Sequence, residues 1–330
     1  MSPSQLHQDI SRLLQNAEKI LLVSHIRADG DAIGSLLGVG LALQLVGKKV
    51  QMVLPEGVPL AFRYLEGSQQ IVRRSEQEYD VSIVLDCSDL QRTGDVLGNR
   101  VPDLNIDHHI TNLNFARLNL VDAEAVATSA ILAEHLPTWG LPITQPVANA
   151  LLFGLVSDTL GFRTSNMNSK ALRLSADLID RGANLAELYH LALIQRSYEA
   201  ARLWGIGLSR LQKQGGLIWT RITLQDKQEV NYLGNDDADL INMLSGITES
   251  DVCVIFVEQT GGRVKVSWRA RAGLDVSQIA IQFGGGGHPA ASGAIIPGTM
   301  EEVQNRVLSA TQSMIEIGVK LADERIKDTL

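Results

Sequence analysis

Short apolar runs alternate with helical patterns over the first half of the chain. Runs with the length and composition of buried strands lie at residues 20–23, 50–54, 81–85 and 104–106. Helical patterns lie at residues 6–14, 32–45 and 146–156, and Gly34, Gly38 and Gly40 would let the second helix pack closely on a sheet. This alternation predicts an α/β domain built on a doubly wound parallel sheet.

The second half of the chain has a different pattern. Residues 169–211 show helical patterning alone, and β-rich runs follow at residues 217–222, 252–257 and 264–268. Gly261 and Gly262 predict a hairpin turn before the last run, and residues 300–322 are helical again. We therefore expect two domains, at residues 1–190 and 214–330, joined by a helical linker at residues 191–213. The second domain is expected to be a smaller α/β domain with a mixed sheet.

Composition and charge limit the partners. A formal charge of −8 argues against binding to long duplex nucleic acid, because such binding neutralises many phosphates. Aromatic residues make up 5%, which is too few for an extended base-stacking groove, whereas a small anionic substrate remains compatible. The amino terminus lacks a secretory pattern and no apolar run has the length of a bilayer span. We expect a cytoplasmic protein without membrane contact, with Cys87 and Cys253 as buried thiols.

Acidic and imidazole side chains follow the apolar runs in four groups. The groups are His25 with Asp29 and Asp31, then Asp86, then Asp107 with His108 and His109, and finally Asp158. Because open α/β sheets bind ligands at the carboxyl ends of their strands, we expect these groups to converge there. So many carboxylates would repel one another unless cations lay between them. The pattern predicts a two-metal hydrolase, although any single aspartate could equally be a helix cap or an ion-pair partner.

Two adjacent histidines belong to the third group. Neighbours on an extended segment point to opposite sides, so His108 can bind a metal while His109 serves another task. Asp107 is either a partner in this site or a structural carboxylate at a strand end.

A glycine-rich stretch in the second half suggests a phosphate-binding loop. Its residues are Gly284, Gly285, Gly286 and Gly287, and His288 follows them directly. Glycines let the backbone approach a ligand and present amide N–H groups to it. A glycine-rich turn by itself is more often only a loop.

Basic residues upstream complete this candidate surface. Ser267, Arg269 and Arg271 alternate, so they share one face of a strand if the strand extends that far. We expect this face to be a substrate wall, with Arg269 as its main cation. Arg163 is either a further phosphate clamp or a solvated arginine.

These motifs together resemble the DHH phosphoesterase superfamily. Its four signature motifs are matched, in order, by His25-x-x-x-Asp29-x-Asp31, Asp86, Asp107-His108-His109 and Asp158. The run from Gly284 to Pro289, followed by Ala291-Ser292-Gly293, is similar to the glycine-rich motif of the DHHA1 domain. The resemblance covers essentially the whole chain and implies a DHH domain followed by a DHHA1 domain.

The resemblance implies a set of ligands and roles. One metal ion would be held by His25, Asp29 and Asp86, and a second by Asp31, Asp86, His108 and Asp158. Mn²⁺ suits this mixture of oxygen and imidazole better than Mg²⁺, which stays the alternative. The resemblance also implies that His109 contacts the scissile phosphate and that Asp107 orients the imidazole ligand. With the bridging Asp86, these two residues form the expected catalytic set.

Within the superfamily, the chain most resembles the stand-alone nanoRNase/pAp-phosphatase group. This implies hydrolysis of short oligonucleotides to mononucleotides and dephosphorylation of 3′-phosphoadenosine 5′-phosphate, with a hydroxide activated by two metal ions. A phosphodiesterase for cyclic di-AMP or linear dinucleotides is the alternative, and a non-catalytic nucleotide sensor is an outside one. The expected partner is a short oligonucleotide or small nucleotide, and a homodimer stays open.

Overall fold

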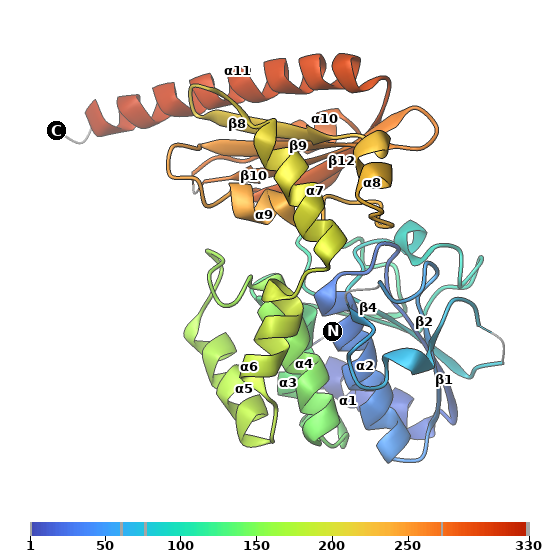
Figure 1. Cartoon of the computed structure of the whole chain (residues 1–330). Coiled ribbons are helices and arrows are strands. Elements are labelled where there is room, and N and C mark those ends of the chain that lie inside the picture. Colours follow the sequence, from blue (N-terminus) through green and yellow to red (C-terminus); the bar gives the residue numbers. More distant parts are fainter. Residues whose placement is uncertain (1, 60–61, 76–77, 272, 328–330) are drawn as a thin grey trace. The chain divides into compact units, whose positions relative to one another are not determined.

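The chain divides into two compact units. The computed structural model describes residues 2–59, 62–75, 78–271 and 273–327. The division falls between Gln195 and Arg196 (Figure 1). Each unit has its own six-stranded sheet. Among the described residues, no helix combines the length and apolar character that a membrane crossing needs.

The first unit is built on a parallel sheet. Its strands are β1 (Lys19–Val23), β2 (Lys49–Val53), β3 (Ile71–Val72), β4 (Val81–Leu85), β5 (Leu104–Asp107) and β6 (Leu118–Val121). They lie in the order β3-β2-β1-β4-β5-β6, and all neighbouring pairs are parallel. The chain builds from β1 toward β3 and then returns to the other side of β1. The carboxyl ends of β1 and β4 therefore flank the switch point, where open α/β sheets bind ligands.

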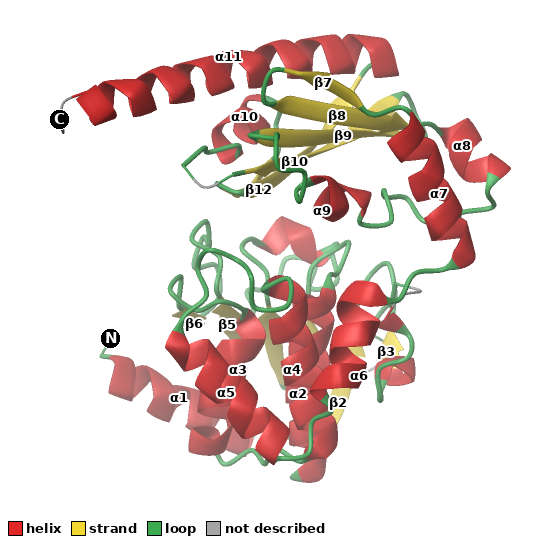
Figure 2. Cartoon of the chain, turned by 60° about the vertical axis from the view of Figure 1, so that its left-hand side comes forward, coloured by secondary structure: helices red, strands yellow, loops and turns green. Residues whose placement is uncertain are grey.

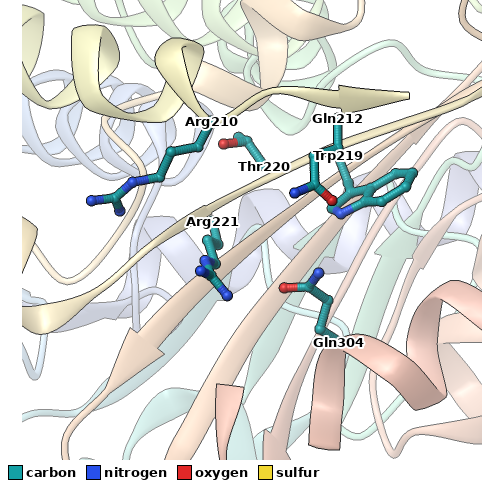
Figure 3. Close-up of a pocket in the computed structure, with 6 residues that line it drawn as sticks. All are labelled: Arg210, Gln212, Trp219, Thr220, Arg221 and Gln304. Atoms are coloured by element: carbon teal, nitrogen blue, oxygen red, sulfur yellow. The ribbon is translucent and has the colours of Figure 1, made fainter. Parts of the chain in front are cut away.

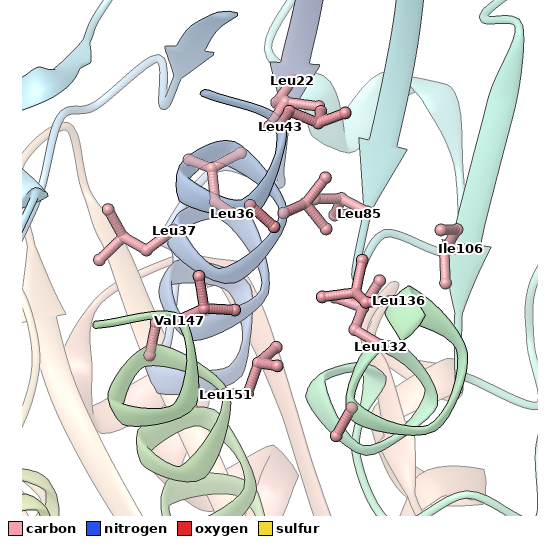
Figure 4. Packing of buried hydrophobic residues seen from close by; sticks show 14 of the residues in the cluster. Leu22, Leu36, Leu37, Leu43, Leu85, Ile106, Leu132, Leu136, Val147 and Leu151 are labelled. Carbon is pink, nitrogen blue, oxygen red and sulfur yellow. The ribbon is translucent and has the colours of Figure 1, made fainter. Parts of the chain in front are cut away.

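Helices cover one face of this sheet. They are α1 (Pro3–Asn16), α2 (Gly30–Leu45), α3 (Thr128–His135) and α4 (Gln145–Asp158), with α5 (Ser169–Asp180) and α6 (Leu185–Tyr189) against α4. Leu36 and Leu151 from the helices meet Leu22 and Leu85 from the strands in one core (Figure 4). A smaller apolar cluster with the buried thiol of Cys87 contains the strand residues that point the other way.

Glycines in α2 allow the helix α4 to pack against its backbone. A Cβ at Gly34 would lie 2.5 Å from the carbonyl oxygen of Ala150 in α4, and one at Gly38 would lie 2.5 Å from the Cδ2 of Leu151. Gly34 and Gly38 are four residues apart and so share a helix face, which here faces α4 instead of the predicted sheet. Of the three glycines, Gly40 meets the sheet, because its Cβ would contact Met52 of β2.

The second unit has a mixed sheet, as predicted. Its strands are β7 (Gln212–Gln214), β8 (Leu217–Ile222), β9 (Val252–Gln259), β10 (Arg263–Ala270), β11 (Gly286–His288) and β12 (Ala291–Pro297). They lie in the order β11-β12-β10-β9-β8-β7, with β8 and β9 parallel and the other pairs antiparallel.

Helices lie on both faces of this second sheet. They are α7 (Tyr198–Ser209), α8 (Leu224–Glu229), α9 (Leu240–Leu244), α10 (Ser277–Gln282) and α11 (Met300–Lys327). Residues of α7 and α9 join one apolar cluster, and residues of α10 and α11 join another on the opposite face (Figure 2). The two clusters take alternate residues of β9, as the pleat of a strand requires.

The glycine-rich stretch forms a strand where a loop was expected. Gly286 pairs with Gly293 of β12, and His288 pairs with Ala291. A Cβ at Gly285 would lie 2.1 Å from the carbonyl oxygen of Gly293, a distance that no side chain could occupy. Gly285 and Gly287 therefore permit a close approach to β12, whereas a Cβ at Gly284 or Gly286 would meet nothing within 4 Å. The strand β11 is an edge strand of the sheet.

Candidate metal centre

The chemical groups predicted from the sequence gather at the switch point of the first sheet. Asp86 follows β4 directly, and His25 lies two residues after the end of β1. Asp31 lies in the first turn of α2, and Asp158 is the last residue of α4. The strand order brings them together, because β1 and β4 are neighbours although far apart in sequence.

The distances make Asp86 the shared member of the cluster. The Nε2 of His25 lies 3.8 Å from Oδ2 of Asp29 and 3.5 Å from Oδ2 of Asp86. The Nε2 of His108 lies 3.7 Å from Oδ1 of Asp86 and 3.6 Å from Oδ2 of Asp158. The two carboxylate oxygens of Asp86 therefore face different imidazoles.

Among the groups of potential ligands that contain Asp86, two consist of predicted ligands alone, and a further one combines Asp86 with Asp107 and His109. Of the first two, one is His25, Asp29 and Asp86, and the other is Asp31, Asp86 and His108; within each group the ligand atoms lie within 4.8 Å of one another. Carboxylate oxygens with imidazole nitrogens are donors that divalent transition-metal ions accept. The residues present thus fit a pair of cations that share Asp86.

The imidazoles are oriented by bonds on their other nitrogen. Nδ1 of His25 lies 2.9 Å from the carbonyl oxygen of Ile26, and Nδ1 of His108 lies 3.4 Å from that of Ala125. With Nδ1 as the donor, each Nε2 presents its lone pair to the carboxylates. The Arg92 guanidinium is 3.2 Å from Nδ1 of His25 and can only donate, so it competes with this arrangement. The bond to Ile26 is shorter, and we assign the proton to it.

The carboxylates of the cluster outnumber the positive charges near them, and the direction of the pKa shifts of Asp31 and Asp158 reflects this. Burial raises the pKa of Asp31 well above its usual range, and the charges of Asp86 and Asp158 add to the effect. Burial likewise raises the pKa of Asp158 to about 7, against the opposing effect of His108. Burial disfavours the charge on His108, but Asp158 and Asp86 outweigh it and raise the pKa of the imidazole to about 9. Divalent cations would supply the charge that these carboxylates lack.

Asp86 is fixed from several sides. Its backbone is left-handed at φ 53°, a conformation that Asp tolerates better than most residues. Its N–H donates to the carbonyl oxygen of Ile106 at 2.9 Å, and its Oδ1 accepts the Thr128 hydroxyl at 3.0 Å. Burial disfavours its charge, but the imidazoles of His25 and His109 outweigh that cost and lower the pKa of Asp86.

The start of α3 is part of this centre and was not predicted. The backbone N–H of Thr128 donates to Oδ2 of Asp31 at 2.6 Å, and that of Ser129 donates to Oδ1 at 3.0 Å. The first N–H groups of a helix have no partner within the helix and favour a negative charge. The sequence signal was only a Thr-Ser pair at a helix start, which says nothing about which carboxylate it binds.

The adjacent histidines correct one prediction. They follow the end of β5, so the alternation of an extended strand does not apply, and their rings meet edge to face at 4.6 Å. Nδ1 of His109 lies 3.8 Å from Oδ1 of Asp86, which places both rings beside the same carboxylate.

Asp107 also differs from its expected role. The Oδ1 of Asp107 accepts a hydrogen bond from the side-chain Nδ1 of His109 at 2.7 Å. From His108 the same oxygen accepts the backbone N–H, at 2.9 Å, and not the imidazole. Asn112, which the sequence did not single out, donates to the other oxygen of Asp107. Asp107 therefore orients His109 and not the predicted imidazole ligand, because the backbone turns after β5.

The candidate substrate residues of the second unit lie mainly on β10 and β11. Ser267 and Arg269 alternate on β10, and the Arg269 guanidinium donates to Oδ1 of Asn242 at 3.1 Å. Burial lowers the pKa of Arg269 in spite of nearby carboxylates. Arg271 falls outside the strand, which ends at Ala270, and forms an ion pair with Asp251. The expected shared face thus holds for the first two residues.

The remaining candidates are exposed except for Gly285, which is half-buried. Gly286, Gly287 and His288 form β11, and Gly285 precedes it. Arg163 is exposed in the turn that follows α4, and its backbone N–H donates to the carbonyl oxygen of Thr159.

Comparisons with known proteins identify the family of both units. Residues 19–155 match the DHH family, N-terminal domain, and residues 231–316 match the DHHA1 domain. The "Bifunctional oligoribonuclease and PAP phosphatase NrnA" of Thermus thermophilus is 33% identical over 300 residues, which cover 89% of each chain. A protein of the same name from Mycoplasma genitalium is 28% identical over 86% of this chain and 90% of its own. The crystal structure of an exopolyphosphatase-related protein from Bacteroides fragilis has a TM-score of 0.87 at 25% identity and covers 98% of this chain and 100% of its own.

Proposed function

The chain belongs to the DHH family with a DHHA1 domain, and from this premise we propose that it is a metal-dependent phosphoesterase. It hydrolyses short oligonucleotides to mononucleotides and removes phosphate from PAP, the activities named for its relatives. The observation that carries the proposal is Asp86, whose two oxygens face separate imidazole and carboxylate groups. The alternative activity on cyclic di-AMP is not favoured, because these relatives bear the oligoribonuclease and PAP phosphatase name.

The metal ligands follow from the two groups around Asp86. His25, Asp29 and Asp86 would hold one ion, and Asp31, Asp86, His108 and Asp158 would hold the other. We expect Mn²⁺ in preference to Mg²⁺, because each group includes an imidazole and Mg²⁺ prefers oxygen and water. When bound, such ions neutralise phosphate charge and lower the pKa of a bound water.

The chain's own residues prepare the reaction. Asp107 accepts a hydrogen bond from Nδ1 of His109 and so orients the ring, and His109 is the residue that we propose contacts the scissile phosphate. The carboxylates of Asp86 and Asp107 raise the pKa of His109 against the effect of burial, which favours the cationic form near a phosphate. Thr128 holds one oxygen of Asp86, and Asn112 holds Asp107. These bonds keep the reacting groups in one arrangement before substrate arrives.

Most of the residues proposed for substrate binding belong to the second unit, and Arg163 of the first unit is proposed as a phosphate-binding residue in its own right. The candidates are Ser267, Arg269, Arg271, Gly285, Gly286, Gly287 and His288. Arg269 is the main cation, since Asn242 fixes its guanidinium and burial strengthens its attraction for a phosphate. We expect Arg269→Ala to raise KM about tenfold or more with a smaller change in kcat. A lower kcat at unchanged KM would contradict this role.

The activity test compares substrates directly. The full chain is incubated with Mn²⁺ and a 5′-labelled dinucleotide, PAP or cyclic di-AMP, and released mononucleotide or phosphate is measured. Turnover of the dinucleotide or PAP is expected. Faster turnover of cyclic di-AMP would favour the alternative, and tight nucleotide binding without turnover of any of the three would indicate a sensor.

A further inference from the structure

A hollow in the second unit lies outside the residues proposed for substrate binding. Its volume is about 210 Å³. It is lined by Arg210, Gln212, Trp219, Thr220, Arg221 and Gln304 (Figure 3). None of these residues belongs to β10 or β11.

Strand register explains why these side chains meet. Gln212 of β7 pairs with Trp219 of β8 in antiparallel fashion, so both side chains stand on the same face of the sheet. Arg221 is two residues beyond Trp219 on β8 and shares that face. The helix α11 packs over it, because Val303 belongs to the same apolar cluster as Trp219, and Gln304 follows Val303.

The two arginines differ in their partners. Arg210 donates to both oxygens of Asp226, at 2.5 and 2.8 Å, and Glu229 adds a weaker attraction. Its charge is therefore largely compensated within the chain. Arg221 is exposed, and among the residues that the structure describes it has neither an ion pair nor a hydrogen bond for its guanidinium. The lining thus holds one uncompensated positive charge.

Two buried polar atoms in the lining also lack partners. Trp219 is 9% exposed, and within the described part of the chain its indole N–H donates to no acceptor. The side-chain oxygen of Gln304 is likewise buried without a donor among the described residues. A buried polar atom without a partner is unfavourable, because it has lost its hydrogen bond to water and gained none in the protein. Both residues line the hollow, and because the last torsion of a glutamine side chain is broad, Gln304 can turn its amide toward it.

We propose that this hollow binds a sugar phosphate of the nucleoside monophosphate class. Phosphate oxygens would accept from the Arg221 guanidinium and from the indole N–H of Trp219, and a sugar hydroxyl would donate to Gln304. The hollow, at about 210 Å³, is many times larger than the roughly 10–15 Å³ that a single water requires, so it has room for a phosphate group with its sugar. The site is separate from the proposed catalytic groups and does not depend on them.

The test follows the indole N–H of Trp219 in the full chain. The protein contains four tryptophans, and Trp219→Phe identifies the resonance in a spectrum of ¹⁵N-labelled indole groups. Adenosine 5′-monophosphate is added without metal, and we expect this resonance to move and to saturate. Arg221→Gln should weaken the binding about tenfold or more, because it removes a charge-assisted contact. Lys213→Gln removes an equal charge from exposed β7 outside the lining, and should leave the affinity unchanged.

Each outcome has a defined meaning. A stationary Trp219 resonance, or a shift that Arg221→Gln leaves unchanged, would overturn the proposal. Movement with adenosine as strong as with the monophosphate would also overturn it, since the phosphate would then carry no recognition. Equal movement with inorganic phosphate would support the phosphate chemistry and assign it to the free ion. Because the test needs neither metal nor turnover, its failure would leave the proposed activity untouched.

Discussion

Two buried aspartates, one in each unit, differ in how the negative charge of the carboxylate is balanced. Asp226 is 3% exposed and receives two bonds from Arg210 and the backbone N–H of Thr223. These bonds outweigh burial and lower the pKa of Asp226. Asp31 is 1% exposed and receives backbone N–H groups from α3 but faces the carboxylates of Asp86 and Asp158, and its pKa is raised.

The difference separates a carboxylate whose charge the chain itself balances from one that we propose binds a metal ion. The charge of Asp226 is balanced by the chain itself, so folding needs nothing else there. The charge of Asp31 faces other carboxylates, and a bound cation would balance it. The attraction between this carboxylate and the cation would then contribute to the free energy of metal binding.

The largest effect is expected from Asp86→Ala. This change removes the carboxylate that both ligand groups share, and we expect loss of Mn²⁺ binding by titration calorimetry and a fall in turnover of at least about a thousandfold. Asp177→Ala, which removes an exposed aspartate from α5 of the same unit, serves as the control. Substantial turnover by the Asp86 variant would refute the shared-ligand assignment.

A smaller effect is expected from Thr128→Val. The change keeps the backbone donors to Asp31 but removes the hydroxyl that holds Asp86, and we expect Mn²⁺ affinity to fall about 10–100-fold. Thr138→Val makes the same change where the hydroxyl donates to the carbonyl oxygen of His135, and should leave the affinity unaltered. Equal affinities for both variants in calorimetry would show that the hydroxyl does not position Asp86.

Asp226→Asn should act on stability and not on metal binding. Loss of the charged partner of Arg210 is expected to lower the free energy of unfolding of the second unit by about 1–3 kcal/mol in denaturant titration. Glu249→Gln removes an exposed carboxylate of the same unit and should change it little. An unchanged unfolding free energy, or a change in Mn²⁺ affinity, would contradict the contrast between the two aspartates.

The smallest expected effect is the pH dependence of the difference in unfolding free energy between wild type and Asp226→Asn. Because the pKa of Asp226 is lower in the folded chain than its usual value, its contribution is present above the usual pKa of Asp, about 4, and is lost as the pH falls through the folded value. The stability gap between wild type and Asp226→Asn should therefore be full at neutral pH and shrink in acid. A gap that grows as the pH falls would mean that another group is responsible.

Much of the architecture could be predicted from local patterns. The run at residues 81–85 is β4 as expected, and the run at residues 20–23 is β1 without its first residue. A strand of alternating or wholly apolar residues shows its position in the sequence directly. The strands β3, β7 and β11 were missed, because two or three residues carry too little periodicity and owe their conformation to a paired neighbour. The longer strands β6 and β12 were missed as well, and β12 begins with the small residues Ala291, Ser292 and Gly293, which do not favour a strand.

The sequence by itself determined which residues are candidates for the chemistry, since polar groups that follow buried strands must emerge at a sheet edge. Only the tertiary structure decided their partners. The pairing of Asp107 with His109, the donors of α3 on Asp31 and the packing of Gly285 against β12 each join residues distant in sequence or turned by a local bend. Such choices depend on strand register and burial, which arise when the whole chain packs and leave no periodic trace in the sequence.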